Sequence, residues 1–345
     1  DMKNYTVKLD ATQYAFNKKL KLELGVLGSE RYGKMKYDPQ KMFYSAAAYN
    51  PTYPTYKNVT TGEWDEDKLA NEIYNPLGQL EVKDRFDVGS LNAHGKATWT
   101  IADGIFLSAF GSYTRLNLDH KRYVPNDIQQ GRINGNGWAY IHNMKRTDIM
   151  GNLQLTYTKD FGEHHIDALA LMEGQRYKTF WNSGQSFKFD TNYFGYNNMK
   201  SGANVSWGDV ESEASEYTLS SYMARLNYMY GNRYIATVNL RTDGSSKLGQ
   251  GHKWGWCPSA SVAWVVSQEA FMKNIRWIDN LKVRLGYGVT GNQDVIAPYN
   301  SLALYAPNGV TLVNGSNTTT YAIQSNDNPD LKWERTTTWN AGVDF

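Results

Sequence analysis

Two kinds of side chain in this sequence could do chemistry: paired histidines and clustered acids. His164 and His165 lie together in a short polar stretch, where they could bind a metal, although solvated turn histidines are far commoner. Two acidic runs, residues 64–67 and 209–216, could hold calcium through carboxylate oxygens, but neither has the spacing of an EF-hand loop. We therefore expect no metal and no cofactor, with calcium in an acidic loop as the unsupported alternative.

The sequence carries none of the short motifs that mark common enzymes. G-x-S-x-G, H-E-x-x-H and C-x-x-C are all absent. A glycosidase needs two carboxylates at a defined separation, which loop acids in an unknown fold do not provide. The single cysteine, Cys257, excludes an internal disulfide framework. A net charge of +2 is too balanced to indicate a nucleic-acid partner. We predict no catalytic residue and no enzymatic activity.

The composition combines a polar average with an excess of aromatic residues. Mean hydropathy is −0.60, yet aromatic residues make up 14% of the 345 residues, including 25 Tyr and 11 Trp. An outer-membrane barrel produces this pairing, because alternate residues face lipid and lumen while Tyr and Trp gather at both interfaces. A Tyr-rich soluble sandwich that binds sugars fits the composition about as well. No run of about 18 apolar residues predicts a membrane-spanning helix, and residues 1–10 do not form a signal peptide.

Period-two alternation recurs along the chain and predicts β-strands. It is clearest at residues 19–28, 151–158, 223–230, 234–241, 283–290 and 339–345. It is less clean near 105–115 and 165–173, where Phe106, Phe110, Leu169 and Leu171 fall on the polar face. The polar faces of three segments supply our candidates for lumen-lining, ligand-binding side chains: Arg225, Asn227, Asn239, Arg241 and Arg284.

The connections between these segments alternate in length, which favours a transmembrane barrel over a soluble sandwich. Short connections are expected at 16–18, 102–104, 161–164, 231–233 and 268–276, and long ones at 33–84, 119–137, 183–215, 244–253 and 291–330. This predicts about eleven strands, or thirteen if 299–305 and 310–321 form a further hairpin. Local helices are expected at 40–49, 66–73 and 267–273. Because an odd number of strands cannot close an up-and-down barrel with both termini on one side, we interpret the sequence as a piece of a longer chain.

A series of short motifs runs in a fixed order through the last hundred or so residues. Its members are Asp243, Gly244, Ser245, Ser246, Trp254, Gly255, Pro258, Ser259, Gly291, Asn292, Gln293, Asn328, Pro329, Leu331, Trp333 and Glu334. In this order and spacing the sequence resembles the SusC/RagA family of TonB-dependent outer-membrane transporters. The upstream portion matches only in style. The composition of residues 243–246 is typical of a turn, so we expect most motif residues to be structural.

The resemblance implies an all-β protein, in which residues 1–345 form an incomplete antiparallel transmembrane β-barrel of about 11–13 strands out of roughly 22. It implies a multi-pass location in the bacterial outer membrane and TonB-dependent import of oligomeric nutrients, with glycans favoured over peptides. The implied partners are a SusD-like lipoprotein lid, outer-membrane lipid, and the TonB complex through parts absent from this sequence, which shows no plug domain and no TonB box.

The loops at 33–84 and 183–215 would meet the lid and the cargo. Within the second loop, Trp207, Tyr193 and Tyr196 are candidates for stacking on carbohydrate. Two other readings stay open: a stand-alone outer-membrane barrel of about twelve strands acting as an enzyme or adhesin, and a soluble carbohydrate-binding β-protein. A native chain near 39.2 kDa would favour the stand-alone barrel, whereas a much larger one would favour transport.

Overall fold

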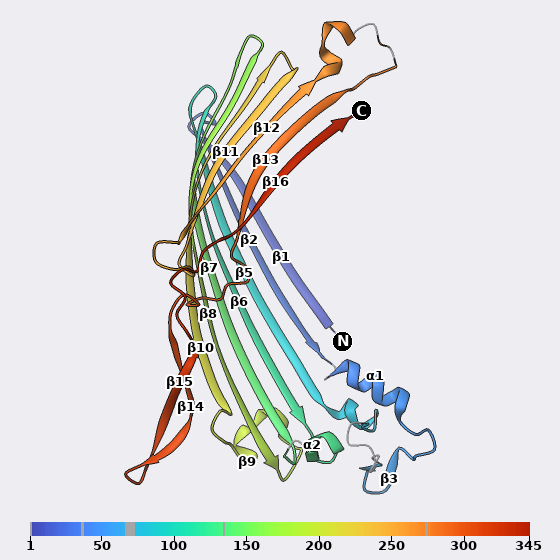
Figure 1. Cartoon of the computed structure of the whole chain (residues 1–345). Coiled ribbons are helices and arrows are strands. Elements are labelled where there is room, and N and C mark those ends of the chain that lie inside the picture. The colour runs from blue at the N-terminus through green and yellow to red at the C-terminus, as the bar shows by residue number, and fades with distance from the viewer. Residues whose placement is uncertain (1, 36–37, 66–72, 134, 273–274, 276) are drawn as a thin grey trace.

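One curved antiparallel sheet dominates the computed structural model, which describes residues 2–35, 38–65, 73–133, 135–272, 275 and 277–345 (Figure 1). The sheet has twelve strands among these residues, and all except β9 follow one another along a single path, which confirms the eleven predicted strands. The path runs through β1 (Met2–Ala15), β2 (Leu20–Lys34), β5 (Lys83–Ala102), β6 (Ile105–Val124), β7 (Trp138–Phe161), β8 (His164–Phe189), β10 (Val210–Tyr230), β11 (Tyr234–Ser245), β12 (Trp254–Val265), β13 (Lys282–Asn292) and β16 (Glu334–Asp344). β1 and β16 form its two edges, so the sheet is not closed.

Short turns lie at one end of the sheet and long connections at the other, as predicted (Figure 1). Several strands nevertheless run further than the sequence indicated. β8 continues to Phe189 and β10 begins at Val210, so both ends of the predicted loop 183–215 are strand. β6 likewise extends to Val124, well inside the predicted loop 119–137. At this end both faces of the strands carry polar residues. The alternation of apolar and polar residues that indicates a strand with one apolar face is therefore absent.

The smaller elements lie mostly at the long-connection end. They are α1 (Pro39–Ala48), β3 (Tyr56–Asn58), β4 (Glu63–Trp64), α2 (Gln129–Ile133), β9 (Gly202–Asn204), and 3-10 turns at Gly78–Glu81, Gly195–Asn197 and Met199–Ser201. α1 confirms the helix expected at 40–49. The helix expected at 267–273 is wrong: two 3-10 turns, Val266–Gln268 and Ala270–Met272, take its place. The helix expected at 66–73 lies almost wholly outside the described residues. No described helix is long and apolar enough to cross a membrane.

The expected extra hairpin exists, but its limits differ from those predicted. β14 (Leu304–Val313) and β15 (Ser316–Ser325) form a separate two-stranded sheet. Its turn lies at Asn314 and Gly315, whose φ angles are 50° and 76°. Asn-Gly is the residue pair that best tolerates such a hairpin turn. The strand predicted at 310–321 was therefore wrong, because the chain reverses within it.

The curved sheet has one apolar and one polar face, because directly opposed residues on neighbouring strands share a face. Leu226 opposes Val238, and Val238 opposes Ala260. The side chains of Leu226 and Val238 are 48% and 54% exposed. One residue along, Arg225 opposes Asn239, which opposes Ser259.

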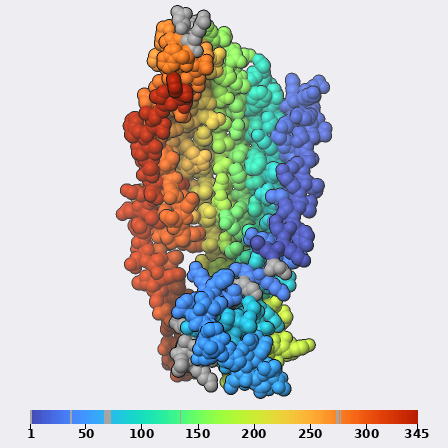
Figure 2. All heavy atoms as spheres, turned by 90° about the vertical axis from the view of Figure 1, so that its right-hand side faces the viewer, coloured from blue at the N-terminus to red at the C-terminus, as the bar shows by residue number. Residues whose placement is uncertain are grey.

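The polar face is the concave one. The first long connection lies on the concave side of the sheet (Figures 1 and 2), and its Trp64 packs with Val124 and the partly buried Trp138. Trp138 points to the same side of β7 as Thr156, an even number of residues along the strand. Thr156 opposes Leu169, which opposes Arg225. Leu169 therefore does lie on the polar face, as its poor fit to the alternation indicated.

Candidate functional site

A polar hollow of about 460 Å³ lies on the concave face, across β10, β11, β12 and β13. Arg225 lies six residues before Gly231, so it sits about 20 Å along the strand from the short turn. That position falls within the thickness of a bilayer. The hollow is lined by Met223, Arg225, Asn239, Arg241, Asp243, Cys257, Ser259, Val289, Thr290 and Gly291.

Two buried polar atoms in this hollow have no hydrogen-bond partner in the described part of the chain. They are Nε of Arg225 and Oδ1 of Asn239, and the two residues oppose each other across β10 and β11. The amide nitrogen of Asn239 donates to the hydroxyl of Ser259 at 3.1 Å. An unsatisfied buried group costs about 1–3 kcal/mol. Each of the two atoms exposes less than 1 Å² to solvent, so a ligand in the hollow reaches it only after a side-chain rotation.

The other predicted lumen residues are already paired. Nε of Arg241 donates to both carboxylate oxygens of Asp243, at 3.0 and 2.9 Å, and Ser221 also donates to that carboxylate. Arg284 forms an ion pair with Asp344 at 2.8 Å, outside the hollow. Asn227 donates to Asp167 at 3.3 Å. The structure thus brings Arg225, Asn239 and Arg241 together and leaves Arg284 and Asn227 apart from them.

The predicted loop aromatics do not join this hollow. Tyr193 and Trp207 are 84% and 56% exposed on the connection between β8 and β10. Tyr196 packs against a buried cluster that includes Tyr123 and Phe189. Tyr123 points to the convex side, because it follows Arg122, which opposes Tyr140 on the concave side. The three aromatic residues of the β8–β10 connection are therefore separate from the polar hollow on the concave face.

The motif residues converge at the long-connection end from three distant segments. The Ser245 hydroxyl donates to the side-chain oxygen of Gln293, the amide of Gly249 donates to the carbonyl of Leu331 at 2.9 Å, and the Trp333 indole donates to the carbonyl of Lys253 at 2.9 Å. We call this set of contacts the loop junction. It ties the β11–β12 connection to both ends of the β13–β16 connection.

Close packing in the loop junction explains its glycines. A Cβ on Gly255 would lie 2.8 Å from the ring of Trp333, and one on Gly291 would lie 3.1 Å from the same ring. A Cβ on Gly249 would lie 1.8 Å from the Pro329 carbonyl oxygen. These contacts favour a structural role for the motif.

The remaining motif residues also find partners nearby. Gly244 packs against Trp254, Ser246 accepts from the Thr218 amide at 2.9 Å, and Leu331 donates to the Asn328 carbonyl at 3.1 Å. Asn292 donates to Glu334 at 3.3 Å. Pro258 opposes Leu240. None of these residues lines the polar hollow.

Sequence reasoning missed a buried charge cluster at the long-connection end of the concave face. Asp84 is 3% exposed, and its carboxylate contacts His120 at 2.6 Å and Arg122 at 2.9 Å. Burial alone would raise the pKa of Asp84, but the His120 hydrogen bond and the Arg122 charge hold this pKa below its ordinary value. The three residues meet only through the strand register, which no local pattern reveals.

A second missed feature is a four-layer stack on the same face. The rings of Tyr177 and Tyr217 stack with centroids 4.5 Å apart. Arg146 lies 5.7 Å from the Tyr177 ring and Lys247 lies 4.2 Å from the Tyr217 ring. Burial lowers the pKa of Lys247. The outer ring faces are covered by these cations, so the stack braces the β11–β12 connection and offers no free platform for a sugar.

No group of three potential metal ligands is assembled among the described residues. His164 contacts the Tyr228 hydroxyl and His165 contacts Asp160, each at 2.7 Å. In the second acidic run, Glu216 is paired with Arg176 and Lys178. Residues 66 and 67 of the first acidic run lie outside the described residues.

Curated proteins similar to this chain are all TonB-dependent receptors. TonB-dependent receptor SusC of Bacteroides thetaiotaomicron is 29% identical over 343 residues, which cover 91% of this chain and 33% of SusC. TonB-dependent receptor P3 of Formosa agariphila is 32% identical over 309 residues, covering 87% of this chain and 29% of the relative. The chain therefore spans about a third of the length of these relatives.

Solved structures show the same fold. The RagAB peptide importer in its closed-closed state superposes with a TM-score of 0.79 at 20% identity, covering 99% of this chain and 38% of the solved one. The open-open state gives a TM-score of 0.78 with the same coverage. A family model described as "TonB dependent receptor-like, beta-barrel" matches residues 36–345. With nine-tenths of its length matched, this chain belongs to the TonB-dependent receptor β-barrel family.

Proposed function

We propose that this chain forms part of the wall of an outer-membrane transporter that imports oligomeric nutrients. The observation that supports this proposal most strongly is the difference between the two faces of the sheet. The convex face is apolar, and the concave face is polar and holds the hollow at Arg225 and Asn239. In a membrane barrel the apolar face meets lipid and the polar face lines the lumen. Family membership places the chain in the outer membrane and supports a non-enzymatic role.

Glycans are the cargo we favour over peptides. The polar side chains of Arg225 and Asn239 line the hollow together with those of Ser259 and Thr290. Sugar hydroxyls both donate and accept, so they can match such side chains in many orientations. The peptide alternative is supported by RagAB, described as a peptide importer. We further propose a SusD-like lipoprotein as the lid and the TonB complex as the energy source, because both accompany the SusC/RagA resemblance.

The test is ligand binding to the intact transporter carrying Asn239→Ala or Arg225→Ala. We expect either change to lower binding of a neutral maltoheptaose probe by about tenfold, because each removes a hydrogen bond worth about 1.4 kcal/mol. The matched control is Asn227→Ala, which removes an amide that already pairs with Asp167 on the same face. A neutral heptapeptide is measured alongside. Loss of peptide binding alone would replace the glycan assignment, and unchanged binding of both probes would remove the hollow from the cargo path.

A further inference from the structure

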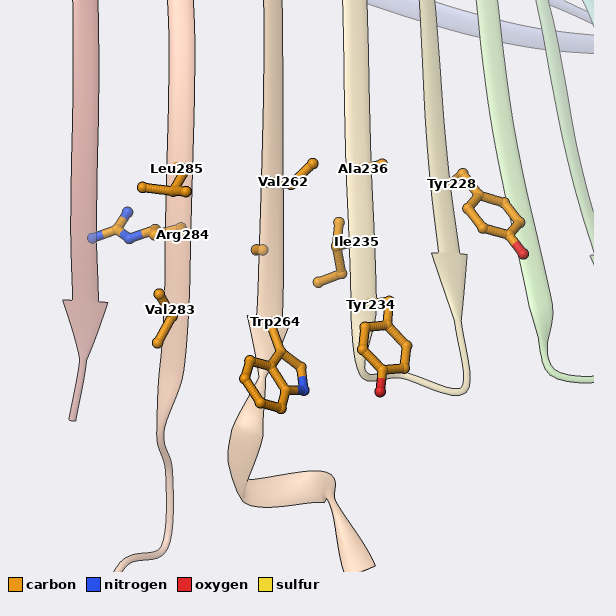
Figure 3. A pocket seen from close by; sticks show the side chains of 10 residues that line it. Tyr228, Tyr234, Ile235, Ala236, Val262, Trp264, Val283, Arg284 and Leu285 are labelled. Carbon is orange, nitrogen blue, oxygen red and sulfur yellow. The ribbon is translucent and has the colours of Figure 1, made fainter.

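A second hollow, of about 420 Å³, lies on the opposite, convex face near the short turns (Figure 3). It continues into a neighbouring hollow of about 250 Å³, because Val262 and Leu285 line both. We call the two together the convex groove. Its convex-facing lining is apolar or aromatic: Tyr228, Tyr234, Ala236, Ala260, Val262, Trp264, Val283, Leu285, Tyr287 and Trp339.

Small side chains between large ones create the convex groove. Tyr228 opposes Ala236, which opposes Val262, which opposes Leu285. Two residues further along these strands, on the same face, Ala260 opposes Tyr287. The short side chains of Ala236 and Ala260 leave space on the convex face. Each alanine lies between larger residues on the two neighbouring strands. Arg284 borders the groove, but its guanidinium turns toward β16 and pairs with Asp344 (Figure 3). The groove therefore offers no unpaired charge from this residue.

Hydrogen bonds anchor the aromatic side chains at the turn-side end of the convex groove. The Tyr234 hydroxyl and the Trp264 indole both donate to Glu269, at 2.6 and 3.0 Å. Glu269 is 8% exposed and also contacts Arg233 at 3.3 Å. Phe271 packs edge-on against Trp264, with ring centroids 6.5 Å apart. Tyr and Trp with an apolar body and an anchored polar tip are typical of a membrane–water interface.

The length of the convex groove corresponds to one leaflet of the bilayer. Trp264 and Ala260 lie four residues apart on β12, which is about 13 Å along the strand. The hydrocarbon core of a bilayer is about 30 Å thick, so each leaflet contributes about 15 Å. Short turns mark the periplasmic side of an outer-membrane barrel. The groove thus runs from the periplasmic interface to near the bilayer midplane.

We propose that the convex groove binds one acyl chain of a phospholipid from the periplasmic leaflet. The groove is continuous with the lipid-facing surface that carries Leu226 and Val238, and its turn-side end lies at the level of the aromatic interface residues. The hydrophobic effect does not favour the groove over the surrounding lipid, because both are apolar. An acyl chain in the groove is therefore held by close van der Waals packing against the residues that line it. Phosphatidylethanolamine and phosphatidylglycerol then bind alike, because the lining contacts the chain and leaves the headgroup free.

The test is native mass spectrometry of the intact transporter titrated with phosphatidylethanolamine in mild detergent. Ala236→Phe fills the larger hollow, and we expect the population of one-lipid adducts to fall about fivefold, which corresponds to about 1 kcal/mol. Ala260→Leu fills the smaller hollow and should act in the same direction. The control is Ala170→Phe, an exposed convex-face position on β8 outside the groove, which should retain lipid like the parent.

Three results would overturn the proposal. Unchanged lipid adducts in both Ala236→Phe and Ala260→Leu, with the β-sheet circular dichroism of the parent, would show that the convex groove holds no chain. A parent that is dimeric in phospholipid nanodiscs and becomes monomeric in Ala236→Phe would show that a second protein copy occupies the groove. Repeating the titration with phosphatidylglycerol checks the headgroup: a strong preference for one lipid would contradict recognition through the acyl chain.

Discussion

Replacing Gly249 with alanine should open the loop junction. A Cβ there would lie 1.8 Å from the Pro329 carbonyl oxygen, so one segment must retreat by more than an ångström. That movement breaks the 2.9 Å bond from the Gly249 amide to the Leu331 carbonyl. Overpacking costs about 1–3 kcal/mol, and the lost hydrogen bond adds about 0.5–1.5 kcal/mol. We therefore expect local destabilisation of about 2–4 kcal/mol.

Hydrogen exchange followed by mass spectrometry on the intact transporter measures this change directly. Peptides covering residues 245–253 and 328–334 should exchange at least about thirtyfold faster in Gly249→Ala, as expected for 2 kcal/mol. The control is Gly184→Ala, where an added Cβ meets no atom within 4 Å, so exchange in both peptides should match the parent. Parent-like exchange in Gly249→Ala would refute the close packing of the loop junction.

Two further predictions concern buried carboxylates. Asp84→Asn should destabilise the long-connection end by about 3 kcal/mol, because it leaves the Arg122 charge without its buried partner. Since the pKa of Asp84 is below its ordinary value, its contribution is complete above the ordinary carboxyl range and disappears as the pH falls through the lowered pKa. Once the intrinsic pH dependence of amide exchange is divided out, the protection of amides at the β5–β6 end should therefore fall on acidification in the parent and depend less on pH in the variant. Equal pH dependence of protection in both proteins would contradict this. Glu269→Gln should cost about 1–3 kcal/mol by weakening the bonds from Tyr234 and Trp264. Faster proteolysis within residues 266–281 would register the loss, and parent-like cleavage would show that the hydrogen bonds to Glu269 do not hold this segment.

Alternation along single strands predicted the faces of the sheet correctly where one face is apolar. The segments around Leu226, Val238 and Leu285 alternate cleanly because a lipid-facing row must be apolar while the concave row is free to be polar. The same reasoning failed beyond the bilayer. At Phe189 and Val210 both faces meet water or loops, so strand and loop have the same composition.

The candidate site could be predicted only in part, because its decisive contacts join residues far apart in the sequence. Alternation selected Arg225 and Asn239, and it also places Asp243 on the same face as Arg241, a local pairing that our sequence analysis did not use. Nothing local indicated that Arg284 faces Asp344, which lies 60 residues away. The motifs were recognisable as a set, yet their convergence on Trp333 depends on packing between three segments that belong to two connections. Register and loop packing carry this information, and neither has a local sequence signature.

The orientation of the two faces is tested most directly by cysteine accessibility in intact outer membranes. In a Cys257→Ser background, single cysteines replace Leu226, Val238 and Leu285 on the convex face and Asn239 on the concave face. A lipid-soluble maleimide should label the three convex positions, whereas a membrane-impermeant, water-soluble maleimide should leave them unlabelled and should react at position 239. Rapid labelling of the convex positions by the water-soluble reagent would contradict the transmembrane wall.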